Sequence, residues 1–216
     1  MKNFLIAIVG IALGLGLTAL YLEYRLTEKP PNKTSPQPTS SFSIATPPSE
    51  SLTGKILSRS GKLLWESRTA TTPAELSGTT NLSQGERIIT DKGSNAVLEF
   101  DRFGKIILSE ESDLAFPQTL PSDFVVNQRF GKIKYEMSGE ISLSIRMRTA
   151  LVTKESGTIE ISMTEDDPII LISTLNGTAK IGFNDAEGVS QVFDLREGQI
   201  YEYNSDERTA MNQNLK

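Results

Sequence analysis

The chain has 216 residues, with 22 lysines and arginines against 27 aspartates and glutamates, and a formal net charge of −5. It contains no cysteine and no histidine, which excludes disulfides, thiolate metal sites, cysteine nucleophiles and imidazole bases or ligands. We therefore expect no metal site, no cofactor and no catalytic residue. The negative charge also argues against nucleic acid as a partner.

An N-terminal stretch, Phe4–Leu22, has Thr18 as its only strongly polar side chain. At about 1.5 Å per residue it would span roughly 28 Å as a helix, close to the thickness of a hydrocarbon core. Tyr21 and Tyr24 lie at its end, where interfacial aromatic residues are common. We predict that residues 1–27 form a single-pass anchor in the cytoplasmic membrane. The alternative is a cleaved signal peptide, whose apolar region is usually shorter.

The predicted helix also carries small residues at helical spacing. Gly10 and Gly14 form a GxxxG pattern, which lets two helix backbones approach closely and can drive dimerisation in lipid. Glycine is common in membrane helices, however, so the pattern also fits a helix without a partner. A weak homodimer is therefore a secondary expectation.

Most of the prolines follow this helix. Pro30, Pro31, Pro36, Pro38, Pro47 and Pro48 lie among many serines and threonines. This composition favours extended conformations and cannot bury enough apolar surface to fold. We predict that residues 28–53 form a disordered linker that holds a domain away from the membrane.

Residues 54–204 show the alternation of apolar and polar side chains that is typical of half-buried strands. We predict an all-β domain, an antiparallel sandwich or roll of about eleven short strands, with a polar tail at 205–216. The predicted strands are 55–59, 62–68, 86–90, 96–100, 105–109, 133–137, 141–148, 158–163, 170–174, 179–183 and 189–195.

A hairpin is predicted around the loop 138–140. A three-residue loop pairs Met137 with Ile141 and Ile133 with Ile145, whereas a two-residue loop would set apolar residues against serines. In this register four cations share the face opposite the apolar one. They form a candidate patch for an anionic partner, or a solvated face that discourages aggregation: Lys132, Lys134, Arg146 and Arg148.

Two further turns have sequence signals. Asn176–Gly177 fits a type I′ hairpin, which would pair Ile172 with Ile181 and place every apolar residue on one face. Asp101–Gly104 suits a type I turn between the strands at 96–100 and 105–109.

Short motifs in this region resemble a FecR-type domain. In the first half they are Gly85–Thr90, Ala96–Phe100 and Gly104–Ser109; in the second half they are Ser156–Ile159, Gly177–Ile181 and Leu195–Gln199. The resemblance covers roughly residues 54–203. It implies an extracytoplasmic β domain behind one transmembrane helix, which in iron-regulatory members receives a signal from an outer-membrane transporter.

The sequence departs from that family in two places. In the iron-regulatory members a cytoplasmic N-terminal segment controls a sigma factor, whereas here only Met1–Asn3 precede the predicted helix. The Asp-Gly-Ser turn usual in the family is replaced by Asp101–Gly104. We therefore expect the family's fold without its sigma-factor regulatory segment.

The expected function is a non-catalytic interaction domain that acts as an envelope sensor, scaffold or assembly partner for a protein or envelope polymer. The carboxylate pairs Glu110–Glu111 and Asp166–Asp167 read as loop residues, and no serine-nucleophile motif is present. A regulator acting through a partner membrane protein is one alternative. A polysaccharide-binding module is another, although Trp65, the only tryptophan, fits a core position better.

The domain is expected to lie outside the cytoplasm, in the periplasm or at the cell exterior. The family resemblance and the exposed spacer favour this topology. Arg25, Lys29 and Lys33 follow the helix, against Lys2 and the α-amine before it. This count leans the other way, but by a small margin.

The turn at Asn176–Gly177 gives a prediction for stability. Replacing Gly177 by valine forces a β-branched residue into positive φ, and we expect a cost of about 1–3 kcal/mol. Asn176→Ala is the milder companion variant and should cost less. Thermal unfolding of both variants measures the difference, and a neutral Gly177→Val would contradict the positive φ.

Overall fold

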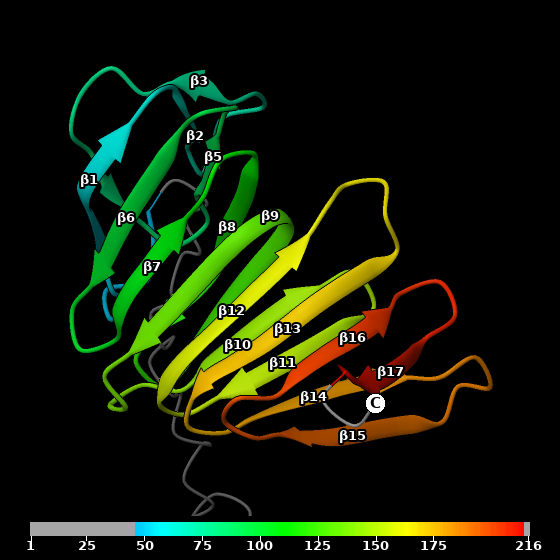
Figure 1. The fold of residues 1–216 in the computed structure, drawn as a ribbon. Helices are drawn as coiled ribbons and strands as arrows, with labels where there is room; N and C mark the ends of the chain where they lie inside the picture. Colours follow the sequence, from blue (N-terminus) through cyan, green and yellow to red (C-terminus); the bar gives the residue numbers. More distant parts are fainter. Residues whose placement is uncertain (1–45, 214–216) are drawn as a thin grey trace, which may run out of the picture. The chain divides into compact units, whose positions relative to one another are not determined.

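The computed structural model describes residues 46–213, whose strands build two β-sheets (Figure 1). These residues contain seventeen strands and no α-helix, which confirms the all-β prediction. The predicted count of about eleven strands is too low, and one strand pair, β9–β10, is parallel and not antiparallel. The predicted membrane helix, its Gly10 and Gly14 and most of the predicted linker lie outside the described residues. Within 46–213 no helix is long and apolar enough to cross a membrane.

The first sheet, sheet A, has nine strands, and every pairing in it is antiparallel. Their spatial order is β4 (Asn81–Leu82), β1 (Gly54–Ser60), β6 (Asn95–Phe100), β7 (Gly104–Leu108), β9 (Asp123–Met137), β12 (Gly157–Met163), β13 (Ile169–Asn176), β16 (Ile200–Asn204) and β17 (Thr209–Asn212).

The second sheet, sheet B, also has nine strands, and β9 belongs to it as well. Its order is β3 (Ala74–Glu75), β2 (Leu63–Glu66), β5 (Arg87–Thr90), β8 (Ser112–Leu120), β9, β10 (Leu143–Met147), β11 (Ala150–Lys154), β14 (Ala179–Asn184) and β15 (Ser190–Leu195). The β9–β10 pair is parallel and all the others are antiparallel.

Strand β9 is therefore the central strand of both sheets. Its residues 123–130 pair within sheet B and its residues 131–137 within sheet A. The change of sheet occurs at Gly131, which has a φ of +96°. A Cβ on Gly131 would lie 2.3 Å from the Cα of Ser112. Only glycine therefore allows the two backbones to approach this closely. In Figure 1, β9 separates the N-terminal from the C-terminal strands.

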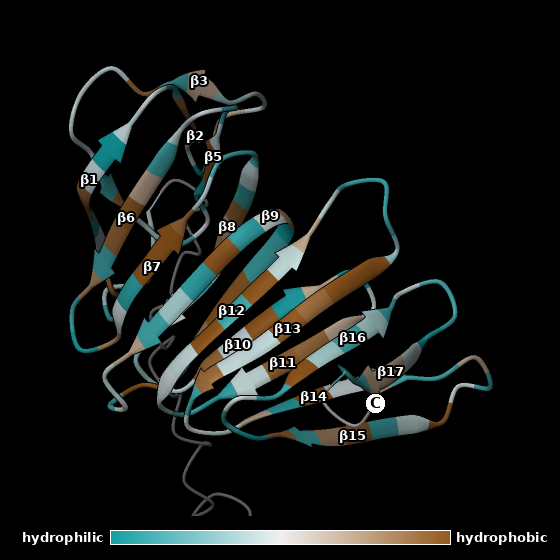
Figure 2. Ribbon diagram, viewed as in Figure 1, coloured by the Kyte–Doolittle hydropathy of each residue, from teal (hydrophilic) through white to brown (hydrophobic). Residues whose placement is uncertain are grey.

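The core lies between the two sheets. In the N-terminal half, aromatic rings from the two sheets pack against each other. The ring centroid of Phe100 in sheet A lies 5.2 Å from that of Phe116 and 5.1 Å from that of Phe124, both in sheet B. In the C-terminal half Phe183 of sheet B lies 4.8 Å from Tyr203 of sheet A. Hydrophobic and hydrophilic residues alternate along the strands (Figure 2), which is the pattern expected of a sandwich with one buried face per sheet.

The hairpin predicted around 138–140 is wrong. Ile133 and Met137 pair with β7 and β12 in sheet A, whereas β10 lies in sheet B and runs parallel to the start of β9. The connection is an arch between facing sheets. Both arrangements bury the same alternate residues, because a strand crossing to the opposite sheet still turns its apolar side chains inward.

The hairpin predicted at Asn176–Gly177 is wrong for the same reason. Ile172 pairs with Ile161 and Tyr201 in sheet A, and Ile181 pairs with Val152 and Phe193 in sheet B. The turn that fits a hairpin in sequence is a second arch.

A buried lysine stabilises this second arch by hydrogen bonds to its backbone. The Lys154 ammonium group is buried and donates to the carbonyl oxygens of Asn176 at 2.7 Å and Thr178 at 3.2 Å. Burial lowers the pKa of Lys154, and the nearby Glu197 carboxylate partly opposes that shift. Gly177 has a φ of +77°, so Gly177→Val is still expected to be strained, although the turn is an arch and not a hairpin.

The predicted pairing of the strands around Asp101–Gly104 is confirmed, since the turn joins β6 to β7 with Phe100 opposite Gly104. The predicted type I geometry is wrong, because Arg102 has a φ of +62°. The polar tail predicted at 205–216 is also wrong in part, because residues 209–212 form β17, which pairs with β16. The end of the predicted linker contacts the domain, since Leu52 and Thr119 exchange backbone and side-chain hydrogen bonds of 2.8 Å.

The crossing at Gly131 gives a second prediction. Gly131→Ala should cost about 3 kcal/mol or more, because the new Cβ meets the Ser112 backbone in addition to the positive-φ strain. Gly188→Ala is the matched control, since Gly188 has a φ of +82° but nothing within 4 Å of an added Cβ, and it should cost about 1 kcal/mol. Equal denaturation midpoints for the two variants would contradict the close approach.

Candidate functional site

The four cations predicted as a patch do not share a hairpin. Lys132 and Lys134 lie in sheet A, where their ammonium groups pair with Glu160 at 2.9 Å and Glu136 at 2.7 Å. Arg146 belongs to β10 of sheet B, and Arg148 follows at its end. The hairpin register that placed all four cations on one face is therefore wrong.

Arg148 has a structural role in the described chain. Its guanidinium group donates to the carbonyl oxygens of Thr164, Glu165 and Asp167 at 2.6–2.9 Å and to the hydroxyl of Ser205 at 3.0 Å. These bonds fix the loop that leaves β12. The side chain predicted to bind an anion instead holds the backbone of that loop.

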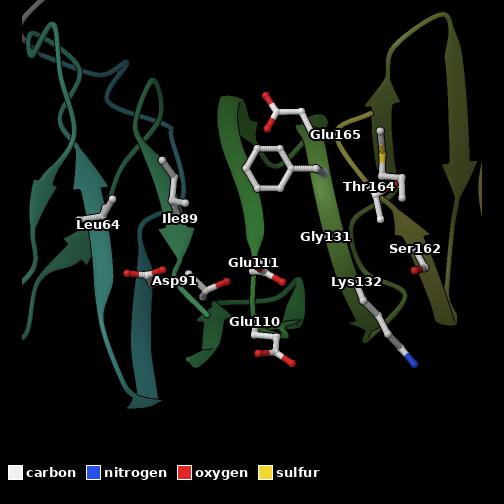
Figure 3. A pocket seen from close by; sticks show the side chains of 13 residues that line it. Leu64, Ile89, Asp91, Glu110, Glu111, Gly131, Lys132, Ser162, Thr164 and Glu165 are labelled. Atoms are coloured by element: carbon white, nitrogen blue, oxygen red, sulfur yellow. The ribbon is translucent and has the colours of Figure 1, made fainter. Parts of the chain in front are cut away.

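A pocket of about 560 Å³ lies beside the bend in β9. Five segments contribute to it: β2, β5 with the residue after it, the loop before β8, the bend itself and the end of β12. Figure 3 shows the side chains that line it: Leu64, Ile89, Thr90, Asp91, Glu110, Glu111, Phe130, Gly131, Lys132, Ser162, Met163, Thr164 and Glu165.

One wall of the pocket is formed by three apolar side chains on the outer face of sheet B, Leu64, Ile89 and Phe130. Leu64 lies opposite Ile89, and the buried Asp113 separates Ile89 from Phe130 in the same cross-strand row. Met163 adds a further apolar side chain from sheet A. Because β9 leaves sheet B immediately after Phe130, this row ends in a hollow instead of continuing onto a neighbouring strand.

The remaining lining includes four carboxylates, from Asp91, Glu110, Glu111 and Glu165. Glu110 accepts a 2.7 Å hydrogen bond from the Gly93 backbone N–H, and Asp91 accepts one of 2.8 Å from the Lys92 N–H. In Figure 3 Glu165 lies at one end of the pocket, and Glu110 at the other. The site therefore combines an apolar wall with several carboxylates and the single ammonium group of Lys132.

An ion network surrounds Asp113, which lies between Ile89 and Phe130. Asp113 is fully buried, and its two carboxylate oxygens accept hydrogen bonds from Arg87 at 2.7 and 2.5 Å. Arg87 also bonds to Glu66 at 2.9 Å, and the Arg129 guanidinium lies 3.6 Å from Asp113. The hydrogen bond to Asp113 is the main cause of a raised pKa at Arg87.

A buried hydrogen-bond network supports the bend from the inside. The Tyr135 hydroxyl donates to Gln128 Oε1 at 3.0 Å, and Gln128 Nε2 donates to the carbonyl oxygens of Gly131 and Ile161 at 2.9 and 3.1 Å. Complete burial raises the pKa of Tyr135 well above its ordinary value, so the hydroxyl remains a donor. These bonds hold β9 and β12 in the arrangement that forms the pocket.

Two expectations about ligands bear on this site. Among residues 46–213 no group of three or more aspartates and glutamates is placed to hold a metal ion, although four carboxylates line the pocket. Trp65 packs against the core and donates from its indole N–H to Glu86 at 3.1 Å. The only tryptophan is therefore used in packing, as the sequence predicted.

Two crystal structures from Parabacteroides distasonis, each of a protein proposed to be an anti-sigma factor, share part of this fold and superpose with a TM-score of 0.51 each. They were determined at 2.50 and 1.65 Å resolution and are 13% and 14% identical in sequence. Each match covers 59% of this chain and 58% of the other. No protein-family model and no curated protein matches the sequence.

The ion network gives a third prediction. Asp113→Ala should cost about 2–3 kcal/mol, because it removes the buried partner of two arginines and leaves Arg87 with Glu66 alone. The matched control is Glu140→Ala, which breaks the exposed Arg102–Glu140 pair and should cost under about 0.5 kcal/mol. Chemical denaturation measures both. A loss at Asp113 no greater than that at Glu140 would show that the network does not stabilise the fold.

Proposed function

We propose that this protein is a non-catalytic, membrane-anchored interaction domain with a regulatory role, and that it binds a protein partner at the pocket beside the bend in β9. The observation that carries the proposal is the composition of that pocket. An apolar wall bounded by carboxylates suits an apolar segment of a partner that also carries a lysine or arginine.

The arrangement of the carboxylates favours binding over catalysis. Asp91 and Glu110 accept hydrogen bonds from backbone N–H groups, which hold them as structural acceptors. Glu165 comes from a loop fixed by Arg148. General acid–base catalysis requires a side chain positioned to exchange a proton with a reacting group in the transition state. The lining instead offers charges spread around an apolar surface.

The regulatory part of the proposal has two supports. The sequence motifs resemble FecR-type domains, and the structures that share part of the fold are each of a protein proposed to be an anti-sigma factor. Together they favour a signalling role in the cell envelope, with the domain outside the cytoplasm and the segment 1–27 in the cytoplasmic membrane.

The absence of native cysteine allows a direct test of site and topology together. Ser162 lines the pocket, and Ser162→Cys would carry a single thiol there. A membrane-impermeant maleimide with a photoreactive group should label this thiol in intact spheroplasts and, after illumination, crosslink one protein partner. Ser58→Cys, on exposed β1, is the control and should be labelled without crosslinking that partner.

The two parts of the proposal fail separately. Labelling of Ser162→Cys only after lysis, with a cytoplasmic marker protein monitored alongside, would contradict the extracytoplasmic location. Labelling in intact spheroplasts with identical crosslinking patterns for Ser162→Cys and Ser58→Cys would contradict the pocket as the binding site.

A further inference from the structure

The four ends of the two sheets differ in how well they are protected. Sheet A ends in β4, which has two residues, and in β17, which has four. Sheet B ends in β3, which has two residues, and in β15, which has six. Among the described strands, β15 is thus the longest at a sheet end.

Strand β15 has few of the features that usually prevent edge strands from pairing with other chains. These features are charged side chains, above all lysine, together with proline, bulges and very short length. Asp194 is the one charged residue of β15, and its carbonyl oxygen accepts a 3.3 Å hydrogen bond from the Tyr201 hydroxyl. The sequence Ser190–Leu195 contains neither lysine nor proline, and its pairing with β14 runs without a bulge. By contrast, β1, which β4 covers at only one end, carries Lys55, Arg59 and a register shift.

The two most exposed large apolar side chains of the described residues lie at this edge. Val192 is 66% exposed and Val189 is 56% exposed, the two highest values among the large hydrophobic residues of the described part. Across β14, Val192 faces Gly182, which offers it no side chain. The next side chain in this row is Leu151 on β11, which lies beyond Gly182, so Val192 has no side chain directly beside it on either strand edge.

We propose that β15 pairs with β15 of a second copy of this chain, antiparallel and about a twofold axis at Val192. The self-complementarity of the strand favours this occupant. With Val192 opposite Val192, Gln191 falls opposite Phe193 and Ser190 opposite Asp194, and Leu195 lies opposite Val189, the residue before β15. No like charges meet within β15 in this register.

Neighbouring registers are less favourable. Centring the pair on Phe193 places the Asp194 carboxylate opposite Val192, and centring it on Gln191 leaves Leu195 beyond the partner strand. The Val192 register also makes the interface isologous, so each copy uses the same surface and the assembly closes at two. A six-residue strand pair is smaller than a standard interface, so the dimer should be weak and concentration-dependent.

Because the chain has no cysteine, single-cysteine variants of the full-length protein in detergent test the proposal. Residues facing each other across antiparallel strands have Cα atoms about 4.5–5.5 Å apart, within the range that a disulfide spans. Val192→Cys should form a disulfide dimer under mild oxidation, about tenfold more than Met211→Cys, which is 53% exposed on β17. Equal disulfide yields for the two variants would overturn the proposal. A dimer held together by the N-terminal segment would give such equal yields.

A mixture of two variants tests the register. Ser190 lies opposite Asp194 of the other copy but about 13 Å along the strand from the other Ser190. Ser190→Cys and Asp194→Cys should therefore crosslink when mixed and not when either is oxidised alone. Crosslinking of Ser190→Cys alone as efficient as that of the mixture would overturn the antiparallel register. Unchanged thermal midpoints of the single variants confirm that the fold is intact.

Discussion

The close approach of Gly131 to the backbone of Ser112 is the constraint on which the rest of the structure depends. It lets one strand serve two sheets, so the N-terminal and C-terminal strands are joined through a continuous backbone. The sandwich therefore needs no interface between two separate halves. Gln128 and Tyr135 secure the bend from within, where a buried polar network is stable only because its members satisfy one another.

The pocket is a geometric consequence of the same bend. On one side of Gly131, β9 continues the outer face of sheet B through Phe130; on the other side it pairs with β12 through Lys132 and its neighbours. The strands on either side diverge where β9 changes sheet, and side chains of both sheets border the resulting hollow. A variant that straightens β9 would therefore alter the binding surface and the core together.

The sequence predicted which side chains are buried better than which strands are neighbours. Alternation correctly indicated that Ile172 and Ile181 face the core, but it is the same for a hairpin and for an arch. The short turn at Asp101–Gly104 was predictable because its strands do pair. The pocket was not predictable, since its lining extends from Leu64 to Glu165 and assembles only through the strand order. Asp113 gave no signal at all, because its burial depends on arginines from two other strands.

The C-terminal half is built from hairpins that alternate between the sheets: β10–β11 in sheet B, β12–β13 in sheet A, β14–β15 in sheet B and β16–β17 in sheet A. Each hairpin pairs with the previous hairpin of its own sheet, and β9 pairs with the first hairpin of each series. Such an arrangement can gain or lose a pair of hairpins at its far end without disturbing the bend in β9. Evolution could therefore vary the length of this domain in steps of one hairpin per sheet while preserving its centre.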